Sequence, residues 1–142
     1  MSDPHKIKIA IVGGRDLRPE ETIKTIMEIL PEEWAIVSGC CPTGVDFLAE
    51  AEALRTGREF VGFPANWEKY GKSAGPRRNQ EMVNYCDAVI AIPSENSSGT
   101  YDAIYKALKA HKPVLNIGWN SNPADIPHSI SQFVQTVISY QF

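Results

Sequence analysis

Short apolar runs rich in β-branched residues alternate along this chain with longer segments that repeat apolar residues every three or four positions. Five runs predict strands, at residues 7–12, 35–38, 60–63, 88–92 and 112–117. Such near-continuous apolar strands are typical of a parallel sheet that is buried on both faces, and the crossovers between them are right-handed. The sequence therefore predicts an α/β fold: a single Rossmann-like, doubly wound domain over residues 1–142, with a mostly parallel five-stranded sheet and helices on both faces.

The segments between the runs have helical periodicity. In residues 19–30 the apolar side chains recur at i, i+3, i+4 and i+7, which is one face of a helix. Thr43 and Asp46 have the spacing of a capping box at the start of the next helix. The other predicted helices contain residues 45–53, 76–86, 100–110 and 130–138, and residues 64–73 and 118–127 are predicted to be loops.

Length and charge limit the classes of partner. With 142 residues, 43% of them hydrophobic, the chain is long enough to bury one proper core. A formal net charge of −3 argues against a basic coat for duplex DNA, although a local patch can still bind a nucleotide or a single strand. These values favour a small-molecule partner over a polymer.

The three cysteines, Cys40, Cys41 and Cys86, are odd in number and lack zinc-ligand spacing. We therefore expect neither a metal nor a cofactor, and this cysteine usage fits the reducing cytoplasm. The first residues lack a signal-peptide core, and no apolar run approaches the roughly 20 residues of a membrane span. The expected protein is cytoplasmic and has no membrane partner.

Polar and glycine-rich loops follow four of the predicted strands. In a parallel sheet, ligands bind beyond the carboxyl ends of the strands, so these loops should converge on one site. They are residues 13–16, 39–46, 64–78 and 93–102. No GxGxxG pattern follows Gly13 and Gly14, which argues against an ordinary NAD site and leaves a tight turn with positive φ as the alternative for this pair.

Two arginines stand where a helix is predicted to begin. Pro76 suits the first turn of a helix, so Arg77 and Arg78 would lie near its positive end, at a cost of about 0.3–1 kcal/mol each. Together with the Ser/Gly/Thr-rich loop 93–102, they indicate a site for an anion, with phosphate favoured.

The roles expected at this site follow from residue chemistry. Backbone or hydroxyl groups of the glycines, serine and threonine would bind phosphate, and the arginines would neutralise it. Trp67 or Tyr70 would stack on a base or simply pack, and Asp46 or Asp102 would contact ribose or a base edge or only stabilise a helix start. The predicted ligand-binding residues are Gly13, Gly14, Arg15, Gly39, Thr43, Gly44, Asp46, Trp67, Tyr70, Arg77, Arg78, Asn79, Ser98, Gly99 and Thr100.

Four segments carry a family resemblance. They are residues 13–16, 38–49, 63–82 and 98–100, and they resemble the small YspA-type members of the SLOG superfamily over about residues 7–117. The superfamily also contains the LOG phosphoribohydrolases, which cleave nucleoside monophosphates, and the Smf/DprA proteins, which bind single-stranded DNA. The resemblance implies a nucleotide-shaped pocket and a homo-oligomer that pairs through helices beside it.

The LOG enzymes match this chain at Arg78, Met82 and Gly99-Thr100, but their catalytic glutamate falls on Ala103. Hydrolysis of an N-glycosidic bond needs a carboxylate, which alanine cannot supply. The sequence therefore favours a protein that senses or sequesters a nucleotide or nucleotide-derived signal. The alternatives are an N-glycosidase that uses Arg78 with Asp102 or Glu95, and single-strand binding, which the acidic balance disfavours.

Overall fold

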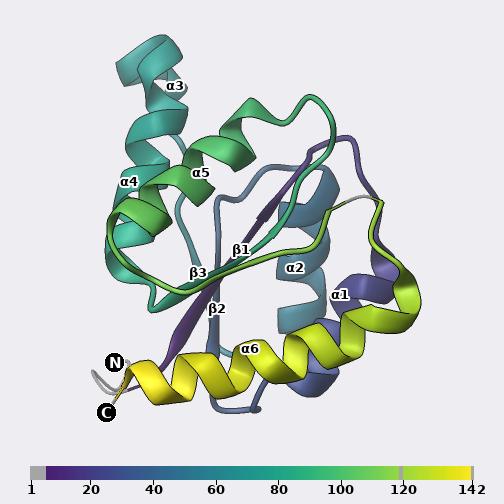
Figure 1. The fold of residues 1–142 in the computed structure, drawn as a ribbon. Coiled ribbons are helices and arrows are strands. Elements are labelled where there is room, and N and C mark those ends of the chain that lie inside the picture. The colour runs from purple at the N-terminus through teal and green to yellow at the C-terminus, as the bar shows by residue number, and fades with distance from the viewer. Residues whose placement is uncertain (1–5, 119, 142) are drawn as a thin grey trace.

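The structure, a computed structural model, describes residues 6–118 and 120–141. Its five strands form one parallel sheet in the order β3-β2-β1-β4-β5 (Figure 1). The strands are β1 (Lys8–Gly13), β2 (Ala35–Ser38), β3 (Phe60–Gly62), β4 (Ala88–Ile92) and β5 (Val114–Asn116). The predicted five-stranded parallel sheet is confirmed. Residues 1–5, where the sequence predicts no signal-peptide core, and Trp119, in the loop predicted at 118–127, lie outside the described residues.

Helices cover both faces of this sheet. The elements are α1 (Glu20–Ile29), α2 (Gly44–Arg55), α3 (Trp67–Tyr70), the 3-10 turn η1 (Gly71–Ser73), α4 (Ala74–Tyr85), α5 (Ser98–Lys109), the 3-10 turn η2 (Pro123–Asp125) and α6 (Ile126–Tyr140). Helices α1, α2 and α6 pack on one face, and α4 and α5 pack on the other (Figure 1). The doubly wound prediction is therefore confirmed.

Alternation along β1 divides the core between the two faces. Ile9 and Ile11 are fully buried toward α1, α2 and α6, whereas Ala10 and Val12 face α4 and α5. Burial of one such isoleucine stabilises the fold by roughly 1.5–3 kcal/mol. The β-branched pattern that predicted the strands is thus also the pattern that fills the core.

The chain reverses its winding direction at β1, which has β2 on one side and β4 on the other. Gly13 at the end of β1 pairs in register with Ile92 at the end of β4. Open α/β sheets form a crevice beyond such a switch point because the following connections leave in opposite directions. The topology therefore places a crevice beside the ends of β1 and β4.

Two predicted loops contain short helical elements. In the predicted loop 64–73, residues 67–73 form α3 and η1, and the Asn66 side chain accepts the Lys69 N–H at 3.0 Å and so caps α3. Helix α4 then begins at Ala74 instead of Pro76, which makes Arg77 and Arg78 its fourth and fifth residues. The predicted helix start is therefore wrong by two residues, and the two arginines lie at the end of the first turn of α4 because η1 leads directly into this helix.

The second of these loops, residues 118–127, contains η2 and the first residues of α6. The Asn122 side chain accepts the Ala124 N–H at 3.0 Å and so begins the turn.

The predicted capping box of α2 is also wrong. Thr43 is the N-cap residue but makes no side-chain cap bond, and Asp46 Oδ2 instead accepts the Cys41 N–H at 3.2 Å. Gly44 enters the helix with a φ of +73°, and the chain bends there so that the Asp46 carboxylate faces the β2–α2 loop.

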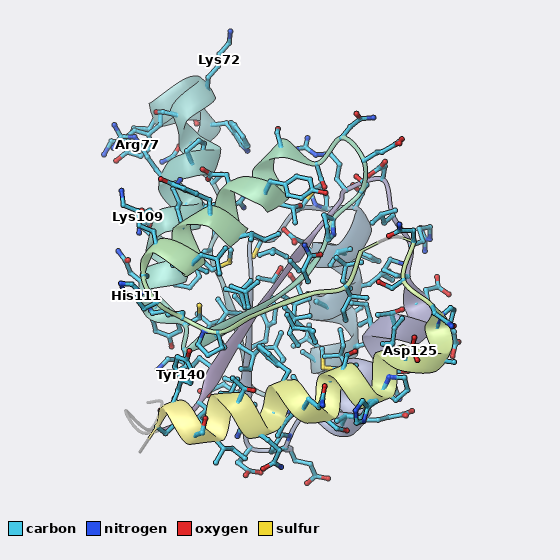
Figure 2. All side chains as sticks on the ribbon, viewed as in Figure 1. Lys72, Arg77, Lys109, His111, Asp125 and Tyr140 are labelled. Carbon is cyan, nitrogen blue, oxygen red and sulfur yellow. The ribbon has the colours of Figure 1, made fainter. Side chains whose placement is uncertain are left out.

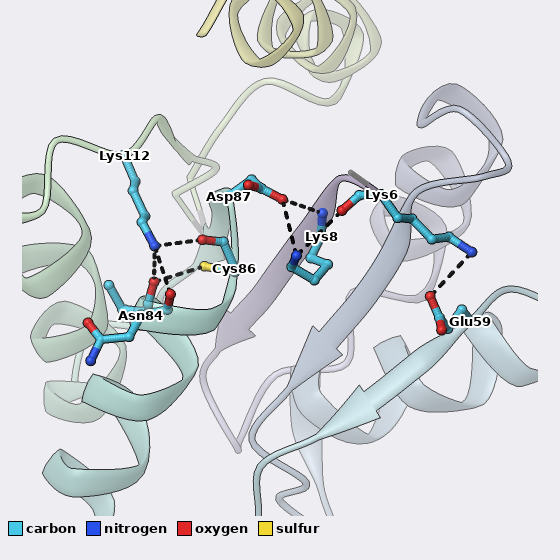
Figure 3. Close-up of polar contacts among 8 residues, drawn as sticks. Lys6, Lys8, Glu59, Asn84, Cys86, Asp87 and Lys112 are labelled. Carbon is cyan, nitrogen blue, oxygen red and sulfur yellow. Dashed lines mark hydrogen bonds and ion pairs between the residues drawn. The ribbon is translucent and has the colours of Figure 1, made fainter. Parts of the chain in front are cut away.

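At the opposite edge of the sheet, two cations close the ends of helices. Lys112 Nζ donates to three carbonyls at the end of α4, those of Val83, Asn84 and Cys86 (Figure 3). The Arg58 guanidinium donates to four carbonyls at and after the end of α1, those of Met27, Leu30, Pro31 and Trp34. Cations are favourable at helix C-termini, so these two side chains stabilise the fold at the amino ends of the strands. Among the described residues, no helix has the length and apolar character needed to cross a membrane.

Candidate functional site

A cavity of about 360 Å³ lies beyond the carboxyl ends of β1, β2 and β4. This volume falls within the range of small-molecule sites. Its lining residues are Val12, Gly13, Arg15, Asp16, Gly39, Cys41, Asp46, Arg78, Asn79, Met82, Ser94, Asn96, Ser97, Ser98, Gly99 and Thr100. All four predicted segments therefore contribute to one cavity, the segment 64–78 through Arg78, which lies on α4.

The start of α5 forms one end of the cavity. The amides of Ser98 and Thr100 already donate to backbone carbonyls of the preceding loop, at 3.2 and 3.0 Å. The Gly99 amide and the two hydroxyls of Ser98 and Thr100 have no hydrogen-bond partner among residues 6–118 and 120–141. Free amides at a helix start attract anions, so this end of the cavity is suited to a phosphate.

Arg78 is held in the cavity wall by the backbone around it. Its Nη1 donates to the Gly39 carbonyl at 2.5 Å and, more weakly, to the Phe63 carbonyl at 3.5 Å, while Nε donates to Asn79 Oδ1 at 2.9 Å. Within the described part of the chain, Nη2 makes no hydrogen bond. The guanidinium is therefore oriented with one nitrogen left for a ligand, and Arg15 adds a second, exposed cation at the end of β1.

Asn79 connects this arginine to the start of α5. Its Nδ2 donates to the Gly99 carbonyl at 3.1 Å and to Asp102 Oδ2 at 3.0 Å. The same Asp102 oxygen accepts Lys106 Nζ at 2.7 Å. Asp102 does not line the cavity, so the predicted pair of Arg78 and Asp102 is not brought together for chemistry.

Asp46 is a carboxylate inside the cavity, and its side chain is almost fully buried. Burial raises the pKa of this carboxyl above its ordinary value, while the Cys41 N–H and the guanidiniums of Arg78 and Arg15 act in the opposite direction. No cation lies within 4 Å of it in the described chain. Asp46 is therefore a strong acceptor that faces the ligand space without an ion pair.

The three cysteines differ in burial and in position relative to the cavity. Burial raises the pKa of the Cys40 thiol, and it raises that of Cys86 to about 11, so neither forms a thiolate readily. Cys41 lines the cavity, but the described residues contain no group of three His, Cys, Asp or Glu side chains placed to hold a metal ion.

Gly13 and Gly14 are required for close packing. A turn does begin at Gly14, whose carbonyl accepts the Leu17 N–H at 3.3 Å, but neither glycine has a positive φ, so that part of the tight-turn alternative is wrong. A Cβ atom at Gly13 would lie 2.5 Å from Val45 Cγ2, and one at Gly14 would lie 2.7 Å from Ser94 Oγ. The Gly14 N–H donates to the Ile92 carbonyl at 3.1 Å, which removes it from the predicted phosphate contacts.

Trp67, Tyr70 and Arg77 lie away from the cavity, on α3 and α4. The Arg77 guanidinium lies 4.4 Å from the centre of the Tyr70 ring and donates to Ser73 Oγ at 3.2 Å. Arg77 and Lys72 project outward at this end of the molecule (Figure 2). Because residues 67–70 form the helix α3 instead of a loop, these side chains do not reach the cavity at the carboxyl ends of the strands.

Of the predicted ligand-binding residues, those that line the cavity are Gly13, Arg15, Gly39, Asp46, Arg78, Asn79, Ser98, Gly99 and Thr100. Gly14, Thr43 and Gly44 lie beside it without lining it. The prediction missed Asp16, Cys41, Ser94, Asn96 and Ser97, although they belong to the loops it selected. Loop composition locates the site, but it does not tell which side chains turn inward.

Comparison with known proteins gives a short sequence match and a longer structural one. No protein-family model matches the chain. The Gene 61 protein of Mycobacterium phage D29 is 46% identical over 55 residues, which are 38% of this chain and 44% of that protein. The chain thus aligns with less than half the length of this curated relative.

DNA processing protein A (DprA) from Streptococcus pneumoniae superposes with a TM-score of 0.69 at 20% identity, over 95% of this chain and 56% of that chain. The chain shares the DprA fold. DprA from Helicobacter pylori, described with a single-stranded DNA binding mode, gives a TM-score of 0.65 at 20% identity, over 94% of this chain and 81% of that chain. DprA belongs to the superfamily that the sequence motifs resemble, whereas the YspA-type subgroup stays a prediction.

Proposed function

We propose that this protein binds a nucleotide or a nucleotide-derived signalling molecule in the cavity at the carboxyl edge of its sheet, as a sensor or sequestering protein of YspA type. One observation carries the proposal. The unpartnered Gly99 amide and the Ser98 and Thr100 hydroxyls line the same cavity as the oriented guanidinium of Arg78. Helix-start donors beside an arginine are a recurrent means of binding phosphate.

Cleavage of the ligand has weaker support than binding. Asp102 is engaged by Asn79 and Lys106 outside the cavity, and Glu95 does not line it. Ala103, at the position of the LOG glutamate, is buried against α4 and the sheet. The N-glycosidase alternative would therefore need Asp46 or Asp16 as its carboxylate.

Single-stranded DNA binding is the second candidate. It is favoured by the DprA fold, since one of the DprA structures is described with a single-stranded DNA binding mode. Two observations oppose it. The net charge is −3, and Trp67 and Tyr70, whose rings would stack on bases, lie away from the cavity.

The same proposal includes a single domain over residues 1–142, a cytoplasmic location and a homo-oligomer. An exposed stripe on α5 supports the last of these, because Tyr101, Tyr105 and Leu108 share one face of the helix and leave large apolar surfaces uncovered. Light scattering on the purified protein measures the mass in solution, and a monomer at all concentrations would contradict the oligomer.

A ligand screen tests the binding proposal. Thermal denaturation with mono-, cyclic and dinucleotides should show a ligand that, at 100 times its Kd, adds about 2.7 kcal/mol to the free energy of unfolding. Chromatography of the same mixtures detects any free base, which would favour the N-glycosidase. Retention of oligonucleotides that weakens steeply with salt would favour the second candidate.

A substitution of Arg78 tests the proposed phosphate contact most directly. Arg78→Ala should weaken nucleotide binding about 10- to 100-fold, since a hydrogen bond from a charged group contributes roughly 1.5–3 kcal/mol. Arg77→Ala should change the affinity little, because its guanidinium lies on Tyr70. Lys72→Ala is the matched control for loss of one positive charge. Equal affinities for all three variants and the wild type, measured by calorimetry, would contradict a phosphate contact at Arg78.

A further inference from the structure

Asp46 has one oxygen in use and one oxygen available. Oδ2 accepts the Cys41 N–H at 3.2 Å, whereas Oδ1 makes no hydrogen bond within the described chain. Only 8% of the residue is exposed, and the residue lines the cavity. The free oxygen is open to the cavity, so a hydrogen-bond donor of a bound ligand can replace water at this otherwise enclosed carboxylate.

The phosphate itself cannot satisfy this carboxylate, because two anions repel each other. The helix-start donors proposed for phosphate lie at the start of α5, which follows β4, whereas the Asp46 carboxylate lies beside Gly39 and Cys41, which follow β2. Arg78 lies between these two parts of the cavity, since it donates to the Gly39 carbonyl and its neighbour Asn79 donates to the Gly99 carbonyl. The strands β2 and β4 lie on either side of β1, so the loops that follow them are separated by about two strand spacings, roughly 10 Å. The ligand must therefore present phosphate at one end and neutral donors a short distance away.

Sugar hydroxyls are the first neutral donors along a nucleotide from its 5′-phosphate, and two of them are adjacent in ribose. A carboxylate accepts hydrogen bonds from both hydroxyls of such a pair. We infer that Asp46 is a specificity-determining residue that binds the ribose 2′- and 3′-hydroxyls and so selects ribonucleotides over deoxyribonucleotides. This inference rests on the proposed function, and it names the class of ligand that the cavity takes.

The inference has a measurable consequence for the wild-type protein. A deoxyribonucleotide lacks one of the two donors, which leaves a buried charged acceptor incompletely satisfied. Ribonucleoside 5′-monophosphates should therefore bind about 10- to 100-fold more tightly than the deoxyribonucleotides with the same base. Calorimetric titration with the four matched pairs measures this ratio.

Asp46→Asn tests whether the carboxylate is responsible. The amide oxygen can still accept the Cys41 N–H, so the β2–α2 loop keeps its support. The variant should bind ribonucleotides about tenfold or more weakly, and deoxyribonucleotides, which keep only the 3′-hydroxyl contact, with a smaller loss, so that the preference narrows. Glu50→Gln is the matched control, because it neutralises a carboxylate one turn further along α2 that does not line the cavity.

The outcomes separate this inference from the function on which it rests. Equal binding of the ribose and deoxyribose forms by the wild type would overturn the inference and leave the nucleotide site standing. A preference that follows the base and is lost in Asp46→Asn would also overturn it, by assigning Asp46 to a base edge. Binding of no nucleotide in either form would overturn the proposed function itself.

Discussion

Gly44 and Gly57 share one backbone conformation but have different surroundings. Both have a φ of +73°, a region that side chains with a Cβ adopt at a cost of about 1–2 kcal/mol. Nothing lies within 4 Å of a Cβ at Gly57, whereas a Cβ at Gly44 would collide with the backbone of Gly14 and Arg15. Gly44 is therefore fixed by both conformation and contact.

The pair gives a prediction about stability. Gly57→Ala should lower the free energy of unfolding by about 1–2 kcal/mol, from the conformational cost alone. Gly44→Ala should lower it by a further 1–3 kcal/mol or so, because backbone at the cavity edge must move. Urea denaturation measures the free energy of unfolding of both variants. Equal losses would show that the loop after β1 moves aside without an energetic cost.

The raised pKa of Asp46 predicts a pH dependence of stability. The folded protein holds this proton more tightly than the unfolded chain, so the free energy of unfolding falls as the pH rises from about 4 through the native pKa. Asp46→Asn removes this loss and should melt at a higher temperature than the wild type at pH 7. The gain should vanish below about pH 4, and a difference that is constant with pH would contradict the prediction.

At the scale of elements, a buried guanidinium joins α1 to the loop that follows it. Arg58 has 8% exposure, and its two terminal nitrogens donate to four carbonyls at 2.6 to 3.1 Å. Arg58→Ala should lower the free energy of unfolding by about 3 kcal/mol, because buried carbonyls lose their donor. Arg58→Lys should recover little, since a compact ammonium lacks the planar fork. Arg55→Ala, an exposed change one turn away, is the control, and its melting temperature should stay near that of the wild type.

Elements that bury an apolar stripe were predicted well, and those that bury little were not. Strand β4 was predicted with its observed bounds, 88–92, because all of its residues are buried and apolar. Helix α3 contains no buried residue and depends on the Asn66 side chain, so apolar periodicity contains no trace of it. Its omission moved the expected positions of Trp67, Tyr70 and Arg77 to the wrong place.

At the scale of the whole molecule, stability should decrease from the centre of the sheet toward its edges. Every residue of β4 is buried, whereas β3 and β5, at the two edges, are only partly buried. Hydrogen exchange should therefore be slowest in the amides of β1 and β4. The amides of β3 and β5 should exchange faster, because these edge strands can open without unfolding of the whole sheet. Equal protection across the five strands, measured by NMR or mass spectrometry, would indicate that the sheet opens only by complete unfolding.

The sequence by itself determined the α/β class, the parallel sheet and the edge at which polar loops gather, because apolar periodicity and loop composition are local properties. Only the tertiary structure decided which side chains of those loops share the cavity. Asn79 contacts the start of α5 from 20 residues away in the chain, Arg78 contacts the Gly39 carbonyl from 39 residues away, and Asp46 turns inward because the chain bends at Gly44. Such contacts depend on the distances between packed elements, and no local pattern of residues contains those distances.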